Sequence, residues 1–274
     1  MPDTRTLIPA RIIAVANQKG GVGKTTTAIN LSAAMAERGQ TILLVDLDPQ
    51  GNASTGLGID PSERQLTSYD LLMGDVDCDA ILLPTGLENL YISPANSDLS
   101  SADIDLVSNA NRMHLLRNAL RAPGMTKRRF DYVIIDCPPS LNLLTLNALI
   151  AADTVLVPLQ AEFFALEGLS QLMLTLREVR QTANPELRVE GVLLTMYDQR
   201  NNLSQQVEND ARATLGELVL RTIIPRNVRV SEAPSHAIPV LNYDTASRGA
   251  IAYRALAREL LARHRKLDTQ KETT

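Results

Sequence analysis

A glycine-rich run between an aliphatic segment and a helical segment constrains this chain more than any other feature. Residues 11–16 (RIIAVA) have the composition of a short buried strand, and residues 25–38 have the pattern of a helix closed by Gly39. Between them lies the run Lys19-Gly20-Gly21-Val22-Gly23-Lys24-Thr25-Thr26. A strand, a glycine loop and a helix in this order bring free backbone N–H groups and a positive helix end together, which favours phosphate.

The residue types in this loop suit a bound nucleoside triphosphate. Glycines let backbone N–H groups approach phosphate oxygens closely and form a concave anion site. Lys24 can reach the β- and γ-phosphates, and the hydroxyl of Thr25 can ligate Mg²⁺. We therefore expect the chain to bind ATP with Mg²⁺.

The loop differs from the standard pattern G-x-x-x-x-G-K-[ST] at its first position. Gln18 stands where the first glycine is expected, and Lys19 follows it directly. A second cation at the mouth of the loop is expected where a phosphate lies within its reach. The alternative interpretation is that Lys19 is a solvated side chain on a surface turn. We favour a functional role for Lys19.

Length and composition bound the domain organisation. With 274 residues and 45% hydrophobic content, one large α/β domain is expected over residues 11–266. Residues 1–10 are expected to be a short extension without a signal sequence, and the polar residues 267–274 a disordered tail. No apolar run approaches the ~18 residues that a membrane helix needs, so we expect a cytoplasmic protein without membrane attachment.

Cysteine and histidine usage excludes several kinds of site. Cys78 and Cys137 are far apart and form no C-x-x-C motif, which argues against a disulfide framework and a zinc site. Cys137 follows an aliphatic run and is expected to be a small buried apolar residue. The three histidines are scattered along the sequence and suggest no metal cluster.

Aliphatic and helical segments alternate along the chain. This alternation predicts an α/β fold with a doubly wound, mostly parallel sheet of seven or eight strands and helices on both faces. The expected strands cover residues 11–16, 41–46, 89–93, 132–135, 154–158, 189–196 and 218–224. The expected helices cover residues 25–38, 141–151, 162–182, 203–217 and 246–266, and residues 61–125 are the least regular part.

Acidic residues follow two of the expected strands directly. Asp46 and Asp48 end the second strand, and Asp136 ends the strand at residues 132–135. Ligands of such sheets bind at the carboxyl ends of the strands, where an acid can hold Mg²⁺ or its water shell beside the phosphates. For one such aspartate alone, a helix cap or a turn is an equally good interpretation; the phosphate loop favours the metal site.

Taken together, these motifs resemble the ParA/MinD superfamily of deviant Walker A ATPases, a branch of the P-loop NTPases. Residues 17–27 (NQKGGVGKTTT) look like its phosphate loop, and residues 46–52 (DLDPQGN) resemble its second acidic motif. Three further runs are similar to ParA-type chromosome-partitioning ATPases, namely residues 196–198, 224–236 (IPRNVRVSEAPSH) and 247–250. The resemblance extends from about Arg11 to about Leu261.

The resemblance implies roles for the nucleotide-binding residues. Lys19 corresponds to the signature lysine that reaches the nucleotide of a partner subunit, and Lys24 to the lysine that binds the phosphates in its own subunit. Pro225 and Asn227 correspond to the segment that packs on adenine. The phosphates would be held by Lys19, Gly20, Gly21, Val22, Gly23, Lys24, Thr25 and Thr26.

The resemblance also implies the roles of the acids. Asp48 corresponds to the residue that positions the hydrolytic water, so that Asp48, Lys19 and Lys24 form the catalytic set. Thr25, Asp46 and Asp136 would support Mg²⁺.

A protein of this family forms an ATP-dependent sandwich dimer that binds double-stranded DNA without sequence preference. A ParB-type partner stimulates hydrolysis through its basic N-terminal segment and releases the ATPase, which is cytoplasmic and associated with the nucleoid. The net charge of −4 gives no general attraction to DNA, so contacts must come from a local patch. The expected DNA contacts are Arg200, Arg229 and Arg248.

Other classes fit less well. A MinD-like membrane-cycling ATPase needs an amphipathic anchor, and residues 263–274 have no apolar face. A small plasmid-partition ATPase without a helix-turn-helix module remains the main alternative. A metabolic ligase on the same fold is disfavoured by the partition-type motifs, and a redox ATPase with a shared metal cluster by the placement of Cys78.

Overall fold

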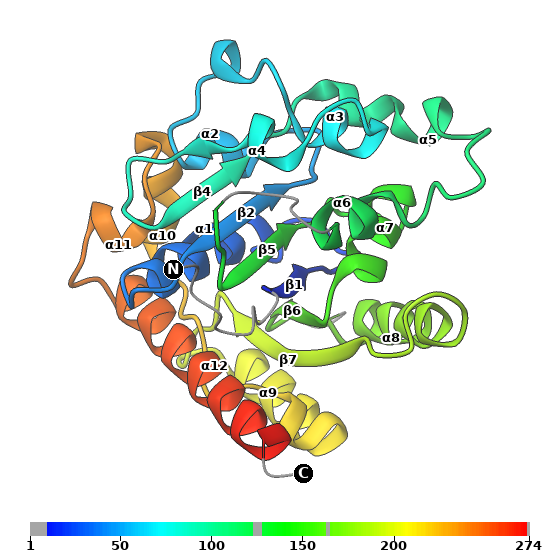
Figure 1. Ribbon diagram of the computed structural model, residues 1–274. Helices are drawn as coiled ribbons and strands as arrows, with labels where there is room; N and C mark the ends of the chain where they lie inside the picture. Colours follow the sequence, from blue (N-terminus) through cyan, green and yellow to red (C-terminus); the bar gives the residue numbers. More distant parts are fainter. Residues whose placement is uncertain (1–9, 123–127, 163–164, 273–274) are drawn as a thin grey trace.

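A mostly parallel sheet forms the centre of the molecule, as Figure 1 shows for the computed structural model. The structure describes residues 10–122, 128–162 and 165–272, and within these residues the sheet has seven strands. The strands are β1 (Arg11–Val15), β2 (Ile42–Asp46), β3 (Leu83–Pro84), β4 (Leu90–Ser93), β5 (Tyr132–Asp136), β6 (Thr154–Gln160) and β7 (Arg188–Thr195). Their order is β3-β4-β2-β5-β1-β6-β7, and only the short β3 is antiparallel to its neighbour. The expected fold class is confirmed, with seven strands.

The strands are aliphatic because both faces of the sheet are covered. Every residue of β2 and β5 is buried. Along β1, Ile12 and Ala14 belong to the core on one face, while Ile13 and Val15 belong to the core on the other. This alternation explains why the strands show continuous apolar runs instead of an alternating polar pattern.

Helices cover both faces of this sheet (Figure 1). One core contains residues of α1 (Lys24–Ala36), α11 (Val240–Tyr243) and α12 (Arg248–Glu272). The opposite core contains residues of α6 (Leu115–Arg121), α7 (Leu143–Ala151), α8 (Ala165–Thr182) and α9 (Asn202–Leu215). The shorter helices are α2 (Asn52–Gly56), α3 (Ser68–Met73), α4 (Cys78–Ile81), α5 (Ala102–Asp105) and α10 (Val228–Glu232), with 3-10 turns at Pro61–Glu63, Ser97–Ser101, Gly216–Leu218 and Ala233–His236.

The described helices include none that is both long and apolar enough to cross a membrane. Cys78 and Cys137 are buried free thiols, as expected for Cys137.

The segment 218–224 is not the additional strand that its sequence suggested. Leu220 and Ile224 donate backbone hydrogen bonds to β7, but two of the three residues between them donate their N–H groups elsewhere. The backbone N–H groups of Arg221 and Thr222 bond to the carboxylate of Glu259 on α12, at 3.0 and 2.8 Å. A side chain of the last helix therefore competes with strand pairing at this edge.

The last helix is longer than its sequence suggested. α12 continues to Glu272, whereas a disordered tail was expected from residue 267. Arg11 at the start of β1 forms an ion pair with Asp268 at 2.8 Å, and the hydroxyl of Thr269 bonds to the carbonyl of Arg265. These contacts continue the helix through polar residues that lack an apolar face. Residues 1–9 of the expected extension lie outside the described part of the chain.

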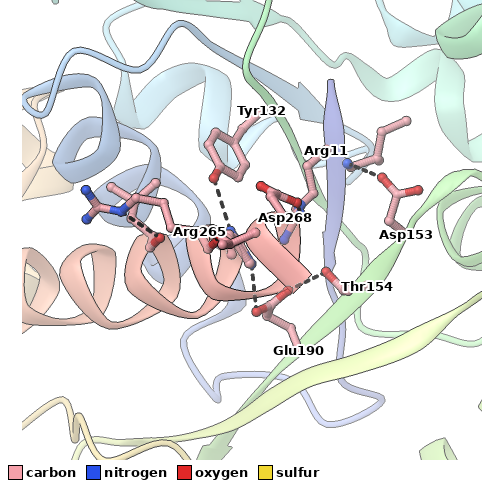
Figure 2. A network of polar contacts seen from close by, with 11 residues as sticks. Arg11, Tyr132, Asp153, Thr154, Glu190, Arg265 and Asp268 are labelled. Atoms are coloured by element: carbon pink, nitrogen blue, oxygen red, sulfur yellow. Dashed lines mark hydrogen bonds and ion pairs between the residues drawn. The ribbon is translucent and has the colours of Figure 1, made fainter. Parts of the chain in front are cut away.

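A buried polar network joins α12 to the sheet (Figure 2). His264 Nε2 lies 2.9 Å from Glu190 Oε1, and its Nδ1 lies 3.1 Å from the hydroxyl of Tyr132. The hydroxyl of Thr154 donates to the other oxygen of Glu190 at 2.6 Å. Burial raises the pKa of Glu190, but the hydrogen bond and charge of His264, with Thr154 and Arg11, outweigh it and leave the pKa below 4.5. The ionised carboxylate is therefore the form that this network stabilises.

We expect Glu190→Gln to lower the free energy of unfolding near pH 7 by about 1–3 kcal/mol, because buried partners lose a charged acceptor. Since the folded-state pKa of Glu190 is depressed, its contribution is present above pH 4.5 and lost as the pH falls through the folded-state pKa. The difference between wild type and variant should thus narrow below pH 4.5. Urea titrations at several pH values across this range measure the difference in free energy of unfolding. Glu186→Gln, at an exposed position, is the control. A difference that does not change with pH would contradict an ionised, hydrogen-bonded Glu190.

Candidate functional site

The phosphate loop connects β1 to α1 and is held by side-chain contacts with β6 and β7. The amide of Asn17 donates to the carbonyl of Pro158 on β6 at 2.7 Å, and the hydroxyl of Thr195, at the end of β7, donates to the carbonyl of Val22 at 2.8 Å. Gly23 caps α1 with φ of 86°, a left-handed conformation that favours glycine. The loop is thus shaped before any ligand arrives.

Asn17 and Thr195 were not among the site residues expected from the sequence. The signal for Thr195 was its position at the end of a strand, the same signal that identified the acids; its partner could not be read from the sequence.

Lys24 lies inside the concave side of the loop. Its side chain is largely buried, and its ammonium donates to the carbonyl of Lys19 at 3.0 Å. Burial lowers the pKa of Lys24, while the nearby carboxylate of Asp136 opposes this most strongly. A buried cation with one backbone acceptor has unused donors, which phosphate oxygens can accept.

Strand register brings two acids side by side next to this lysine. Asp136 on β5 pairs with Asp46 on β2 and with Val15 on β1. All three residues end their strands and lie on the face that α1 covers, because residues paired in register share a face. The acids that followed separate strands in the sequence therefore meet beside the phosphate loop.

The carboxylate of Asp136 is fully buried at the end of β5. Both oxygens of this fully buried carboxylate lack a hydrogen bond with the described residues. Burial raises the pKa of Asp136 well above its usual value, and the charge of Asp46 adds to this, while Thr25 and Lys24 act in the opposite direction. An unpaired buried carboxylate is costly unless a cation satisfies it. The position and chemistry of Asp136 fit Mg²⁺ or its water shell.

Asp46 differs from Asp136, because hydrogen bonds already occupy its oxygens. One oxygen accepts from the backbone and the hydroxyl of Ser54 at 2.9 and 2.7 Å, and the other accepts from the backbone of Asp48 at 3.2 Å. Burial raises the pKa of Asp46 to about 6, against the opposing hydrogen bonds of Ser54. Asp46 therefore shapes the loop that carries Asp48.

Asp48 lies at the turn between β2 and α2 and is 8% exposed. It accepts a hydrogen bond from the backbone of Gln50 at 3.0 Å, which leaves its second carboxylate oxygen without a hydrogen bond from the described residues. No group of three or more His, Cys, Asp or Glu side chains within the described residues is arranged to hold a metal by itself. A metal here would therefore need phosphate oxygens and water as further ligands.

Lys19 points away from the interior of its own loop. Its ammonium lies 3.3 Å from a carboxylate oxygen of Glu162, in the segment that follows β6, and both side chains are at least 39% exposed. An exposed ion pair of this kind contributes little stability, about 0–1 kcal/mol. Lys19 can therefore exchange this partner for another anion at the surface.

Pro225 and Asn227 line a cavity of about 200 Å³ next to the phosphate loop. Gly23 and Thr26 are among its lining residues, and the buried amide oxygen of Asn227 has no hydrogen-bond partner among the described residues. The structure thus brings the two residues expected at adenine within one cavity of the loop that would hold the phosphates.

A larger groove, of about 1060 Å³, adjoins this cavity and shares Pro225 and Asn227 with it. Its walls include Arg200 and Arg248, two of the three expected DNA contacts, together with Arg226. Arg200 forms an ion pair with Asp198 at 3.2 Å.

Arg229, the third expected DNA contact, lies outside this set of lining residues. It forms ion pairs with Glu232 at 2.9 Å and with Asp244 at 3.3 Å. Arg226 was not among the three expected DNA contacts, although it lies three residues before Arg229 in the sequence.

Comparisons with known proteins agree with this site. A family model described as an AAA domain matches residues 10–189. The chromosome partitioning protein ParA of Caulobacter vibrioides is 56% identical over 257 residues, which cover 94% of this chain and 96% of that protein. The sporulation initiation inhibitor protein Soj of Bacillus subtilis is 52% identical over 252 residues, which cover 92% of this chain and 98% of that protein.

One solved structure of similar fold carries the name of a metabolic enzyme and not of a partitioning protein. The crystal structure of cobyrinic acid a,c-diamide synthase from Mycobacterium smegmatis, with bound ADP and magnesium, is 44% identical with a TM-score of 0.81. The match covers 94% of this chain and 96% of that one. The partitioning proteins are more similar in sequence over an equal share of the chain. From the family model and these relatives, this chain belongs to the ParA/Soj family of chromosome-partitioning P-loop ATPases.

Proposed function

We propose that this chain is an ATP-dependent DNA-segregation ATPase whose nucleotide state controls dimerisation and DNA binding. The observation that carries the proposal is the pairing of a buried cation, Lys24, with an unpartnered buried carboxylate, Asp136, beside a preformed glycine loop. These groups have the charges and positions that MgATP requires. In relatives of the same fold, ADP or an ATP analogue and magnesium are bound.

In the proposed site, the loop amides of residues 20–26 and Lys24 bind the phosphates, and Thr25 and Asp136 hold Mg²⁺ with Asp46 behind them. Magnesium would neutralise charge on the phosphate oxygens. Asp48 has a free carboxylate oxygen at the rim of the site, and we assign it the positioning of the water that attacks the terminal phosphate. Phosphoryl transfer depends mainly on positioning and electrostatics, so fixed geometry is the main contribution of the protein.

We propose that ATP joins two copies of this chain through Lys19. Its weak surface contact with Glu162 would be exchanged for the terminal phosphate bound by the partner. A phosphate carries more negative charge than one carboxylate, and the interface would exclude water, so the exchange favours the dimer. Hydrolysis removes that phosphate and weakens the interface.

The arginine groove is the proposed contact with double-stranded DNA. Arg226 and Arg248 are exposed and have no ion pair or side-chain hydrogen bond with the described residues, so their charges are available. Arg200 and Arg229 would exchange their acidic partners for phosphates. Dimerisation doubles such contacts and gives salt-sensitive binding without sequence preference, which would place the protein on the nucleoid.

A ParB-type partner is the proposed stimulator of hydrolysis, supported by the chromosome-partitioning relatives. A metabolic activity is the competing assignment, because of the name given to the Mycobacterium smegmatis structure. ATP-dependent retention on DNA separates the two, because a metabolic enzyme gives none.

We expect Lys24→Ala to weaken ATP binding by about 30-fold or more, because a buried charge-assisted contact contributes about 2–3 kcal/mol. Calorimetric titration with an ATP analogue and Mg²⁺ measures the affinity. Lys266→Ala, at an exposed position on α12, is the matched control and should bind like wild type. Unchanged affinity in Lys24→Ala would refute the phosphate-loop assignment.

We expect Asp48→Ala to bind ATP but to hydrolyse it about 100-fold more slowly, because the attacking water loses its orientation. The variant should therefore accumulate as an ATP-bound dimer, which sedimentation velocity detects. Combining it with Lys19→Ala should restore the monomer while ATP remains bound. Normal turnover in Asp48→Ala, or dimers that form without Lys19, would contradict the respective roles.

We expect Arg248→Glu to keep ATP binding and dimerisation but to weaken DNA binding. Each lost phosphate contact should lower the slope of log affinity against log salt by about 0.9, and by roughly twice that in a dimer. Arg200→Glu and Arg229→Glu should act in the same direction, while Arg38→Glu, an exposed arginine outside the groove, is the control. Equal DNA affinity in Arg248→Glu and Arg38→Glu would place the contact elsewhere.

A further inference from the structure

Arg64 is a buried arginine that follows the 3-10 turn Pro61–Glu63 and is 9% exposed. Among the described residues no carboxylate lies within ion-pair distance of its guanidinium. Burying an unpaired charge is costly, so its contacts must compensate for lost hydration. The neighbouring charge of Asp46 gives partial electrostatic compensation.

Oxygen atoms from the loop behind Asp48 surround this guanidinium. Nη1 donates to the carbonyl oxygens of Gly51 at 3.4 Å and Ala95 at 3.1 Å. Nη2 donates to the hydroxyl of Thr55 at 2.8 Å and to the carbonyl of Ile59 at 2.7 Å. The four acceptors come from the start and end of α2, the turn that follows it, and the segment after β4. One planar guanidinium therefore joins α2, the turn that follows it and the segment after β4.

These contacts continue directly to Asp48. The N–H of Gly51 bonds to the carbonyl of Asp48 at 2.8 Å, and the hydroxyl of Thr55 bonds to the carbonyl of Gly51 at 3.1 Å. On the other side, Asp46 holds Ser54, whose hydroxyl accepts from the N–H of Ala95 at 3.0 Å. The loop that carries Asp48 is therefore held between a buried acid and a buried arginine.

Gly51 makes this arrangement possible. Its φ of 61° is left-handed, and a Cβ placed there would collide with Nη1 of Arg64 and lie 2.9 Å from the carbonyl oxygen of Ala95. The glycine in the run Asp48-Pro49-Gln50-Gly51 thus gives the guanidinium access to the backbone.

We propose that Arg64 is a positioning residue for ATP hydrolysis, which fixes residues 48–56 so that Asp48 is held at the nucleotide. The inference rests on the proposed role of Asp48 and adds a residue that acts through it. A guanidinium suits this task because its rigid planar donors hold several acceptors at once, which an ammonium cannot do. Misplacement of a catalytic group by about 1 Å can cost ~100-fold in rate, so a remote clamp can control turnover.

The proposal predicts a loss in turnover without a loss in nucleotide affinity. The phosphate loop is held by Asn17 and Thr195, and neither contacts Arg64, so ATP binding should survive its removal. We expect Arg64→Met to lower kcat by about 10- to 100-fold while the ATP dissociation constant stays within about twofold. Arg64→Lys keeps the charge but loses the fork, so its kcat should lie between those of Arg64→Met and wild type.

The experiment measures ATP hydrolysis at saturating MgATP with DNA present, ATP affinity by calorimetry, and thermal unfolding of each variant. Arg121→Met is the matched control, since Arg121 also binds a backbone carbonyl, that of Ala10, and the carboxylate of Asp153. That variant should be less stable but turn over at the wild-type rate. If Arg64→Met does not fold, Thr55→Val removes one acceptor of the fork with little change in volume and should lower kcat several-fold.

Two results would overturn the inference. The first is a wild-type kcat in folded Arg64→Met, or in Thr55→Val if Arg64→Met does not fold. The second is a parallel loss of ATP affinity and kcat, which would make Arg64 a general structural residue. Asp48→Ala, measured in parallel, separates this from the larger proposal. If Asp48→Ala is inactive while Arg64→Met turns over normally, only the role of Arg64 fails; if Asp48→Ala turns over normally, the role of Asp48 fails and that of Arg64 with it.

Discussion

The placement of β5 between β1 and β2 determines the chemistry of this protein. Parallel pairing in register puts the carboxylate of Asp136 next to Asp46 on one side and next to the start of the phosphate loop on the other. The helix that follows the loop then buries Lys24 over the same strand ends. The sheet therefore concentrates two acids and a lysine in a region from which water is excluded. The carboxylate of Asp136 accepts no hydrogen bond from the described residues, which leaves room for a cation as its partner.

The two loops at this edge are held by different means. Side chains of Asn17 and Thr195 hold the phosphate loop, and these contacts do not involve the acidic loop. The loop of residues 48–56, which carries Asp48, is held by hydrogen bonds to the carboxylate of Asp46 and to the guanidinium of Arg64. The two loops therefore depend on different side chains for their conformation. The surface groups differ again, since Lys19 makes only an exposed contact that other partners can replace.

Particular elements show why the sequence predicted the core and failed at its edges. Strands buried on both faces are continuous aliphatic runs, and their apolar character reveals them locally. Residues 218–224 are aliphatic apart from Arg221 and Thr222, and Glu259 takes the backbone N–H groups of these two residues. The polar end of α12 was expected to be disordered, yet Asp268 contacts Arg11, which is 257 residues away along the chain. Such long-range contacts leave no local signal.

The sequence alone determined the order of strands and helices, the glycine loop with its two lysines, and the acids that end the strands, because each depends on residues close together in the chain. Only the tertiary structure decided which carboxylate lacks a hydrogen bond, which arginines share a groove, and which arginines form ion pairs. It also placed the buried guanidinium of Arg64 against the segment that follows Asp48. The physical reason is that hydrogen bonding and burial depend on neighbours from distant segments, and folding alone determines which neighbours each side chain meets.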